Sequence, residues 1–510
     1  MSEEMIKFEK AAFLVKNWGQ SLLENGKTLE EILTIEGVSL WSVISPYLAV
    51  NRLTEVENEY PGYKFNIKNR KITAYIRRKI LNYRIRKAYK QNKINNKVNG
   101  FIFLGFSEYI SREILDPVAY HIKKLNTNEA VIVRYNFKSH NINKKIDLSI
   151  WSFWSNDNFT ELKKIKNSLE IATREIKKSV VFKSLIENSG TNSISIKKLF
   201  NWILNIYLPN LLIYIIIARA IMIKCKPGLI VSPDVHDPRS RIFTTVGKIF
   251  NIKTLEIQFS FYNSLNVEWK FFIADRLAVT GLQNQAVMIE HGIDSDKLTI
   301  TGSPRYDRID LFTNDCITKF RKNMGIEKSQ HVLLFASQPC VPGAFTSKLK
   351  RNEMLKGIVS AATNCKNITL VIKPHPLENI KELQGLINKN SKIVYITKDT
   401  DIRNLIQICD VFLTYTSNTT FDAIILNKPT INVSYPNANI DTTFDKSGAT
   451  LVAKCDEELA KIFEMIDKNK ITEVFQPCAK YREDFIEKWF FQIDGKSTER
   501  IAAICMKMIK

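Results

Sequence analysis

The stretch Val371–Leu377 reads V-I-K-P-H-P-L and closes an apolar run that begins at Ile368. Apolar, β-branched residues followed by proline predict a buried strand that ends abruptly at Lys373. The two prolines restrict the backbone on both sides of His375. An ammonium group and an imidazole are therefore expected at the carboxyl end of a strand, where open α/β sheets bind ligands. Together they could hold a phosphate; the alternative is a stiff loop with a surface histidine.

A second apolar strand, Val411–Thr416, leads into S-N-T-T-F-D-A at Ser417–Ala423, an apolar helix and the turn Asn427–Pro429. Ser417 is a favourable helix N-cap, and the hydroxyl and N–H groups behind it predict an anion site. Asp422 lies about one helical turn inside, where its carboxylate could accept ribose hydroxyls. Ordinary capping with a solvated acid is the alternative.

These motifs resemble the donor-binding half of GT-B glycosyltransferases, in particular bacterial surface-polysaccharide enzymes. The similar groups are the CDP-glycerol glycerophosphotransferases, the capsule Kdo-type transferases and the sialyltransferases with a His-Pro motif. T-G-S-P-R-Y-D at Thr301–Asp307 resembles their interdomain segment, and D-G-K-S at Asp494–Ser497 resembles the start of their C-terminal helix. The resemblance covers roughly residues 225–505. It implies an α/β protein of GT-B fold, with two Rossmann-like domains facing each other across a cleft.

Length and composition agree with that architecture. A chain of 510 residues can hold two large domains, and an apolar content of 45% is sufficient for full cores. The predicted domains are an N-terminal helical region at 1–98, an acceptor-side Rossmann-like domain at 99–315, a donor-binding Rossmann-like domain at 316–475 and a C-terminal region at 476–510. A linker is expected at about Asp307–Ser329. One final helix, about Tyr481–Lys510, is expected to cross back to the first domain.

The net charge of +22 is concentrated in one segment, with thirteen Lys and Arg and no acid at 64–97. Apolar residues interleaved with these cations predict a basic amphipathic helix. Each cation near an anionic leaflet contributes on the order of 1 kcal/mol, so several together allow reversible docking on the inner face of the cell membrane. A solvated helix face is the alternative. No nucleic-acid-binding motif accompanies the charge, so a nucleic-acid partner is not expected.

Two further features concern the cellular compartment. Leu199–Ala218 contains no charged residue and is long enough to span a bilayer, but three asparagines and Pro209 favour a buried helix. The eight cysteines show no CxxC pair, which favours reduced thiols over disulfides or a zinc site. The acidic N-terminus lacks the apolar core of a signal peptide. A cytoplasmic protein associated peripherally with the membrane is therefore expected.

A predicted strand, Leu229–Ser232, opens onto P-D-V-H-D-P-R at Pro233–Arg239. An acceptor hydroxyl needs a general base, for which a carboxylate or imidazole is suited. The catalytic candidates, among which the sequence does not choose, are Asp234, His236 and Asp237. The alternative is a capped turn with a salt bridge to Arg239. Related polymerases carry Gln-His-Gly at the next strand end, whereas this chain has Q-F-S at Gln258–Ser260, so a catalytic role is not transferred there.

A nucleotide leaving group needs fixed cations and N–H dipoles, which these strand ends can supply. No DxD-like ligand pair is evident, so neither a metal nor another cofactor is expected. The predicted donor-binding residues are Ser337, Gln338, Lys373, His375, Pro376, Thr416, Ser417, Asn418, Thr419, Thr420 and Asp422. The predicted interdomain residues are Gly302, Ser303 and Arg305.

The resemblance implies an inverting glycosyltransferase of polysaccharide or capsule biosynthesis. Its donor would be a CMP-activated nonulosonic acid or Kdo-type sugar, and its acceptor a hydroxyl of a cell-surface glycan, a lipid-linked molecule or a protein. Three alternatives stay open: transfer of a polyol phosphate from CDP-glycerol or CDP-ribitol, a sugar-nucleotide enzyme like UDP-GlcNAc 2-epimerase, and a catalytically silent scaffold.

Overall fold

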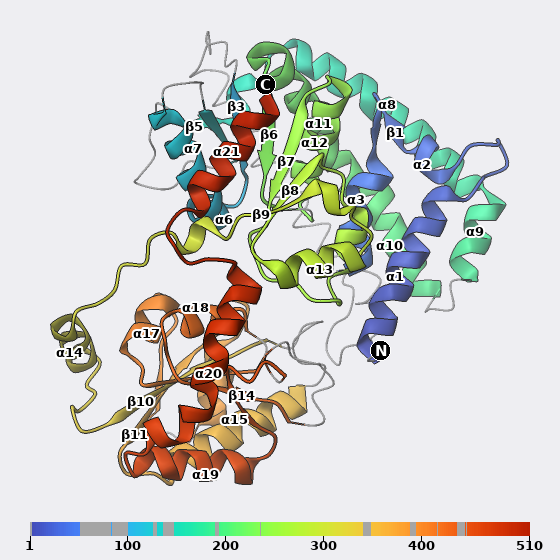
Figure 1. Ribbon diagram of the computed structural model, residues 1–510. Helices are drawn as coiled ribbons and strands as arrows, with labels where there is room; N and C mark the ends of the chain where they lie inside the picture. The colour runs from blue at the N-terminus through green and yellow to red at the C-terminus, as the bar shows by residue number, and fades with distance from the viewer. Residues whose placement is uncertain are drawn as a thin grey trace. The chain divides into compact units, whose positions relative to one another are not determined.

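The computed structural model contains two α/β units, each built on a parallel sheet (Figure 1). The structure describes residues 3–50, 83, 100–125, 130–135, 147–188, 193–234, 236–339, 348–387, 394–415, 417–435, 444 and 446–509. The N-terminal unit comprises Met5–Arg308 and Ile493–Lys510, and the C-terminal unit comprises mainly Ile309–Gln492. Apart from Tyr83, the basic segment 64–97 lies outside the described residues, as does Thr416.

The sheet of the N-terminal unit has seven parallel strands in the order β5-β4-β3-β6-β7-β8-β9. The strands are β3 Phe101–Gly105, β4 Ala130–Arg134, β5 Asp147–Ser149, β6 Leu229–Ser232, β7 Lys253–Ile257, β8 Arg276–Val279 and β9 Leu298–Ile300. The central strands are apolar and buried along their length, because helices cover both faces of a parallel sheet. Chain order reverses between β3 and β6, and such a switch point is where open sheets bind ligands.

The sheet of the C-terminal unit has six parallel strands in the order β12-β11-β10-β13-β14-β15. The strands are β10 His331–Ala336, β11 Ile368–Lys373, β12 Val394–Ile396, β13 Val411–Thr414, β14 Thr430–Val433 and β15 Leu451–Ala453. Its order reverses between β10 and β13. The strand predicted to end at Lys373 is confirmed as β11. The expected α/β class, with two Rossmann-like domains, is confirmed as well.

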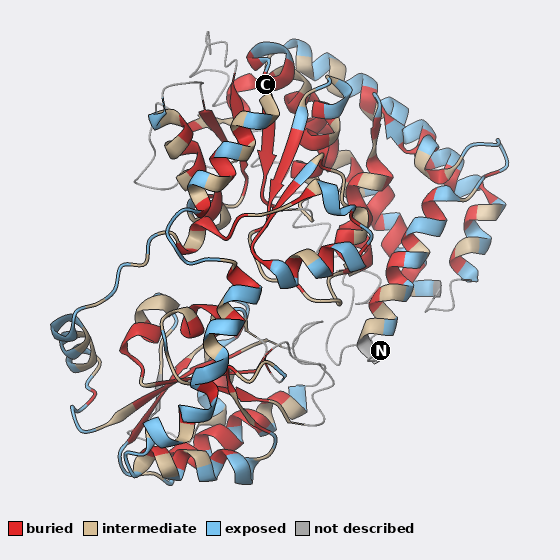
Figure 2. Ribbon diagram, in the orientation of Figure 1, coloured by how far each residue is buried: buried red, intermediate tan, exposed pale blue. Residues whose placement is uncertain are grey.

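Helices cover both faces of each sheet (Figure 2). The N-terminal unit has α1 Glu3–Gln20, α2 Leu29–Ile32, α3 Leu40–Leu48, α6 Glu108–Ile110, α7 Asp116–Lys124, α8 Asp157–Lys178, α9 Val180–Glu187, α10 Ser193–Trp202, α11 Leu208–Cys225, α12 Pro238–Ile249, α13 Leu282–Glu290 and α21 Ser497–Ile509. The C-terminal unit has α14 Asn314–Asn323, α15 Lys348–Thr363, α16 Ile380–Leu386, α17 Ile402–Ile408, α18 Thr419–Ile425, α19 Asp456–Asp467 and α20 Ile471–Phe490.

The side chains of the central strand β3 point alternately into two separate apolar cores. Ile102 and Leu104 face the core formed by α11, α12 and the N-terminal helices. Phe101 and Phe103 face the opposite core, which α7 and α21 close. The N-terminal helices α1 and α3 are thus part of the N-terminal unit, because their apolar side chains share its larger core.

The uncharged stretch around α11 is a buried helix that leads into β6, as expected. By length and composition Ile194–Cys225 is the one helix of the described residues that could cross a membrane. Most side chains of α11, however, are buried against the core of the N-terminal unit. A helix with an apolar surface all round is typical of a protein interior as well as of a membrane.

Two expected boundaries are wrong. The segment expected to be a linker includes α14, whose Ile317 and Phe320 pack on the core of the C-terminal unit. The single C-terminal helix is instead two, α20 in the C-terminal unit and α21 in the N-terminal unit. The helix α20 ends at Phe490, and the next residue, Phe491, has a positive φ of 62°.

The two motifs that resemble the family's interdomain segment and C-terminal helix meet in the N-terminal unit. The carboxylate of Asp307 accepts the N–H groups of Ser497 (2.9 Å) and Thr498 (2.6 Å), and therefore caps α21 from another part of the chain. Arg500 donates to the carbonyl of Thr301 at 2.7 Å. The predicted interdomain residues, Gly302, Ser303 and Arg305, lie in this segment, just before the unit boundary after Arg308.

One buried arginine joins the N-terminal helices to the Rossmann-like core. Arg241 of α12 donates to the carbonyl of Ser42 in α3 (3.0 and 3.2 Å) and to that of Phe271 (2.8 Å). Its side chain is 2% exposed. A buried carbonyl that loses a donor cannot recover the bond from water, so the contact is costly to remove.

We predict that Arg241→Met lowers the melting temperature of the N-terminal unit. The cost is about 1–3 kcal/mol for each carbonyl left without a donor, and each kcal/mol corresponds to roughly 2–4 °C. Calorimetry measures the melting temperature, and Arg219→Met is the control. Arg219 is partly exposed and pairs with Glu36 and Glu161 at 3.6 and 3.8 Å, so its loss should cost less than about 1 kcal/mol. Equal effects of the two substitutions would contradict the prediction.

Candidate active site

The catalytic candidates lie at the switch point of the N-terminal sheet, between the end of β6 and the start of α12. Pro238 occupies the first turn of α12, where the missing N–H costs nothing. Asp237 is the N-cap, and its carboxylate accepts the N–H of Arg239 at 2.9 Å. The strand and the capped helix therefore fix the short segment between them, which carries Asp234 and His236.

Asp237 is committed to structural partners. Its carboxylate pairs with the guanidinium of Arg239, with Nη2–Oδ2 at 2.6 Å. That guanidinium also lies over the rings of Phe106 and Tyr135, at 5.2 and 5.1 Å from their centres. Although burial lowers the pKa of Arg239, the carboxylate of Asp237 outweighs burial and raises it. For Asp237 the structure thus has the capped turn and salt bridge of the alternative hypothesis.

His236 lies between two carboxylates. Its Nδ1 is 3.5 Å from Oδ1 of Asp234, and its Nε2 is 3.2 Å from Oε1 of Glu268. Oδ1 of Asp234 also accepts the backbone N–H of His236 at 2.9 Å. Burial alone would lower the pKa of the imidazole, but Glu268 and Asp234 outweigh it and raise that pKa to about 10. His236 is therefore an imidazolium at neutral pH and holds both carboxylates in place.

Glu268 was not predicted from the sequence. It belongs to the 3-10 helix Val267–Phe271, is fully buried, and accepts the amide of Asn266 at 2.9 Å. Its position between Val267 and Trp269 gives no sign of a site, because a single acid in an apolar run is not a motif. Only the fold places its carboxylate beside His236.

More buried polar groups surround this triad. Glu256 of β7 pairs in register with Ser232 at the end of β6. Burial, with a contribution from Asp234, raises the pKa of Glu256 to about 8, although Arg241 opposes the shift. Among the described residues, Oε1 of Glu256, Oε2 of Glu268 and the hydroxyl of Tyr262 are buried without a hydrogen-bond partner. Such groups cost free energy unless water or a ligand meets them, so this edge of the sheet is suited to a polar molecule.

The Q-F-S segment after β7 has a structural role. The amide of Gln258 donates to Asn284 and to the carbonyl of Ser260, both at 2.6 Å, and its oxygen accepts the N–H of Thr280 at 3.0 Å. Phe259 packs on an apolar core. Neither side chain can exchange a proton with an acceptor hydroxyl. No catalytic role is therefore transferred from the related polymerases to this strand end.

In the C-terminal unit, Glu378 holds the loops that follow β10 and β11. Its Oε1 accepts the hydroxyl of Ser337 at 2.9 Å and Nη2 of Arg351 at 2.6 Å, while Oε2 accepts the N–H of His375 at 2.7 Å. The side chains of Arg351 and Glu378 are 6% and 2% exposed. The K-P-H-P segment is therefore held by a buried ion pair as well as by its prolines, and Ser337 is brought next to His375.

The geometry defines what His375 and Lys373 can offer a ligand. Burial lowers the pKa of His375, although Glu378 opposes the shift, so the ring is neutral at pH 7. Its Nδ1 accepts the N–H of Leu377 at 3.2 Å, which places the ring proton on Nε2. Lys373 donates from Nζ to the carbonyl of Lys398. Burial also lowers the pKa of Lys373, although the carboxylates of Asp401 and Asp399 oppose this shift.

The helix start after β13 differs in detail from the prediction. The N-cap residue of α18 is Asn418, not Ser417. Ser417 instead accepts the N–H of Thr419 at 3.3 Å and shares a hydrogen bond with the Thr419 hydroxyl at 2.8 Å. Asp422 is buried, and its Oδ1 lies 3.6 Å from Nε of Arg403. Its role toward a ribose stays a prediction, and so do the ligand contacts of Gln338, Pro376 and Thr420.

No group of three or more His, Cys, Asp or Glu side chains in the described part of the chain has the geometry of a metal site. The polar groups fall into two sets, one at each switch point. The N-terminal set is acidic, with an imidazolium between carboxylates. The C-terminal set presents N–H, hydroxyl and ammonium donors, which suits it to an anion.

Comparisons with known proteins gave one match to a family model. Residues 275–507 match the family model of CDP-Glycerol:Poly(glycerophosphate) glycerophosphotransferase. This match supports a transferase of surface-polymer biosynthesis. Comparison of the sequence with curated proteins gave no match.

Solved structures similar to this chain include the wall teichoic acid polymerase TagF, with 12% identity, a TM-score of 0.48, and coverage of 88% of this chain and 98% of that one. UDP-GlcNAc 2-epimerase from Neisseria meningitidis is also similar, with 14% identity, a TM-score of 0.46, and coverage of 80% and 99%. Similarity at this level does not identify a substrate.

We predict that the stability of the N-terminal unit falls as pH rises from about 6.5 to 10. A pKa raised in the folded state adds stability below the unfolded value, near 6.5 for His236, and that stability is lost as pH rises through about 10. Glu256 acts in the same direction up to about 8. Calorimetry across this range should show a smaller decline for His236→Gln than for the unmodified protein. His331→Gln, at a half-buried site in the C-terminal unit, is the control; a parallel decline in all three proteins would contradict the prediction.

Proposed function

We propose that the protein transfers a polyol phosphate, such as glycerol phosphate, from a CDP-activated donor to a hydroxyl of a surface polymer or of its lipid-linked precursor. The observation that carries this proposal is the match of residues 275–507 to the glycerophosphotransferase family. It favours the polyol-phosphate alternative over the CMP-sugar donor, which was the first expectation from the sequence. The matched residues contain the whole of the C-terminal switch point, where the donor-binding residues were predicted.

The proposed step is a substitution at phosphorus. The acceptor oxygen attacks the phosphorus that carries the polyol, and the bond from that phosphorus to the bridging oxygen breaks. CMP leaves with the bridging oxygen, and the acceptor proton passes to a base. Because negative charge develops on the leaving phosphate, fixed hydrogen-bond donors lower the barrier.

We assign the donor nucleotide to the C-terminal switch point. The Nε2–H of His375 is a neutral donor on a loop that Glu378 and two prolines hold rigid. Lys373 ends β11 and the Ser417–Thr420 segment follows β13, and these two strands flank β10. These groups supply charge and N–H donors without a bound metal, so we propose that the reaction is metal-independent and uses no other cofactor.

We assign the general base to Asp234. Its side chain is 23% exposed, whereas those of Asp237 and Glu268 are 12% and 0% exposed and are engaged elsewhere. His236, protonated and held by Glu268, fixes the orientation of Asp234. A carboxylate in this role typically contributes 10²–10⁴-fold to the rate.

We predict that CDP stabilises the protein more than CMP, UDP or GDP does. A ligand present at about 100 times its Kd adds about 2.7 kcal/mol, which shifts a melting curve by several degrees. His375→Ala should reduce the CDP shift, because it removes the Nε2–H donor. His331→Ala is the control, since that histidine begins β10 at the opposite edge of the same sheet. A preference for CMP would favour the CMP-sugar donor, and a preference for UDP would favour the epimerase-like alternative. No shift with any nucleotide would favour the silent scaffold.

We predict that Asp234→Asn lowers the transfer rate by 10²–10⁴-fold and leaves the CDP affinity unchanged. Asp237→Asn should keep most activity, because Asn is also a good N-cap, and should lose about 1 kcal/mol of stability with the ion pair. Release of CMP that depends on acceptor, assayed in excess EDTA, measures both variants. Equal activity of Asp234→Asn and the unmodified protein would exclude Asp234 as the base. Loss of activity in EDTA that magnesium restores would contradict metal independence.

We propose that the protein works in the cytoplasm at the inner face of the membrane, held by the basic segment 64–97. Replacing the cations from Arg77 to Lys90 with glutamine should abolish co-sedimentation with vesicles that contain phosphatidylglycerol. Each lost cation weakens binding by on the order of 1 kcal/mol. Equal co-sedimentation of the variant would show that another surface binds the membrane.

A further inference from the structure

The guanidinium of Arg239 is held by residues from three strand ends of the N-terminal sheet. Arg239 itself follows β6, whereas the two rings that its guanidinium covers, Phe106 and Tyr135, directly follow β3 and β4. Asp237 accepts from Nε at 2.9 Å and from Nη2 at 2.6 Å, so the plane of the group is set as well as its position. An arginine held in this way presents its remaining N–H groups in a fixed direction.

The two rings are themselves held in place. Trp151 donates from Nε1 to the carbonyl of Tyr135 at 3.1 Å and meets its ring edge to face, with ring centres 5.4 Å apart. The side chain of Tyr214 in α11 also hydrogen-bonds that of Tyr135. Phe106 is buried and packs edge to face on Phe243 of α12, with ring centres 5.3 Å apart. The guanidinium therefore lies on a rigid aromatic surface.

One edge of this guanidinium is open. The ion pair with Asp237 uses Nε and Nη2, and Nη1 of Arg239 has no hydrogen-bond partner among the described residues. The side chain of Arg239 is 26% exposed, so a molecule in solution can reach it. A charged guanidinium with free N–H groups on one edge matches the oxygens of a phosphate, which it can bind in a bidentate manner.

The formal charges at this strand edge balance at neutral pH. The three carboxylates are Asp234, Asp237 and Glu268, and the three cations are His236, Arg239 and Arg241. Burial raises the pKa of Glu256 to about 8, so that side chain is largely uncharged at pH 7. His236 lies between two carboxylates, and Arg241 is buried and bonded to carbonyls. Arg239 is thus the cation of this set that can take a further anion.

The matched family is named for an acceptor, poly(glycerophosphate), in which each unit carries a phosphodiester. In such a polymer a phosphodiester lies only a few bonds from the terminal hydroxyl. Asp234, the proposed base, and Arg239 both lie at the junction of β6 and α12. A group that can accept the hydroxyl proton and a group that can bind the neighbouring phosphate are therefore present at one strand end.

We propose that Arg239 selects the acceptor, binding with its open edge the phosphodiester next to the hydroxyl from which Asp234 accepts a proton. The preferred acceptor is then a polyol phosphodiester, such as the growing end of a polyol phosphate polymer, and not a neutral glycan. This inference rests on the proposed transfer function and adds the charge of the acceptor to it. Arg239 determines specificity and exchanges no proton.

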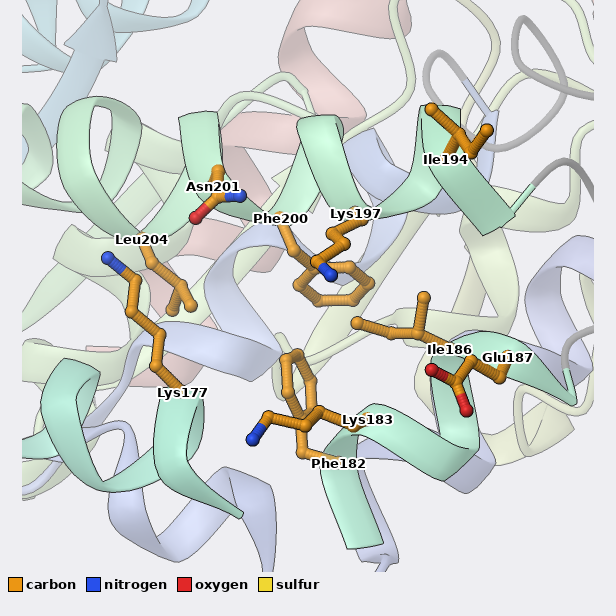
Figure 3. A pocket seen from close by; sticks show the side chains of 10 residues that line it. All are labelled: Lys177, Phe182, Lys183, Ile186, Glu187, Ile194, Lys197, Phe200, Asn201 and Leu204. Atoms are coloured by element: carbon orange, nitrogen blue, oxygen red, sulfur yellow. The ribbon is translucent and has the colours of Figure 1, made fainter. Parts of the chain in front are cut away.

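A second group of cations in the N-terminal unit supplies the control. The exposed lysines Lys177, Lys183 and Lys197 line a cavity of about 220 Å³ among α8, α9 and α10, which also has apolar walls (Figure 3). These lysines attract an anion through charge alone, without the fixed fork of an arginine. Replacing Lys183 and Lys197 with glutamine therefore measures the effect of lost positive charge away from the switch point.

Binding of two matched probes, followed by NMR titration of the full-length protein, tests the assignment. Glycerophosphoglycerol joins two glycerol units through a phosphodiester, and diglycerol joins the same units through a neutral ether. The unmodified protein should bind the phosphodiester about tenfold more tightly or better, as expected for charge-assisted hydrogen bonds. Lys183→Gln/Lys197→Gln should keep this preference.

The double variant Arg239→Met/Asp237→Asn should lose the preference. It removes both partners of the ion pair and keeps a good N-cap, so no unpaired charge remains to unfold the loop. Arg239→Lys should retain only part of the preference, because an ammonium keeps the charge and lacks the fork. An unchanged preference in the double variant would overturn the inference, and so would its loss in Lys183→Gln/Lys197→Gln.

Transfer kinetics separate this inference from the proposed function. With CDP-glycerol as donor, the ratio of kcat/KM for glycerophosphoglycerol to that for diglycerol should fall about tenfold in the double variant. A merely structural role of Arg239 would lower both values together. CMP release with both acceptors and an unchanged ratio would overturn the inference and leave the transfer function standing. No CMP release with either acceptor would contradict the transfer function, and the titration would still decide whether Arg239 selects a phosphodiester. A smaller CDP shift in the double variant would mean that Arg239 binds the donor, which would also overturn the inference.

Discussion

Reversal of strand order at the centre of each parallel sheet is the constraint on which the functional geometry depends. A parallel sheet needs crossover helices on both faces, and the chain can fill both only by changing direction once. The reversals fall between β3 and β6 in one unit and between β10 and β13 in the other. At those two points adjacent loops diverge to opposite faces, so polar side chains at the strand ends gather without being neighbours in sequence. Every group assigned here to donor or base lies at one of these points or at the next strand.

The two units use the same physical device to hold a histidine-bearing loop. In each, a glutamate from outside the strands is buried beside the loop: Glu268 next to His236, and Glu378 next to His375. The electrostatic results are opposite, however. Glu268 accepts from the imidazole itself and keeps it protonated, whereas Glu378 accepts the backbone N–H and is neutralised by Arg351, which leaves the His375 ring neutral. One histidine is thus suited to orienting a carboxylate, and the other to donating a hydrogen bond to an anion.

The strand ends could be predicted from the sequence, because prolines, β-branched runs and capping residues act locally. That is why β11 ends at Lys373 as predicted, and why the Asp237 cap could be anticipated as an alternative. The partners that decide each role could not be predicted, because they come from distant segments. Glu268 and Glu378 carry no local signal, and the cap that Asp307 gives to α21 joins two motifs far apart in the chain. The wrong C-terminal helix has two causes: α21 begins at a cap that Asp307 supplies from a distant segment, and Gly495, with a φ of 74°, is a local signal in the break between α20 and α21.

The choice between Asp234 and Asp237 follows from what each carboxylate would lose by accepting a proton. Protonation of Asp237 would weaken its pair with Arg239 and the cap of α12, and so would disturb the helix that closes the switch point. Protonation of Asp234 leaves His236 still paired to Glu268, so the imidazolium is not left as an unpaired charge in a buried site. A base has to change its charge in every catalytic cycle without unfolding its surroundings. Asp234 is the carboxylate at this edge whose partner has a second counter-ion, and this redundancy makes its protonation tolerable.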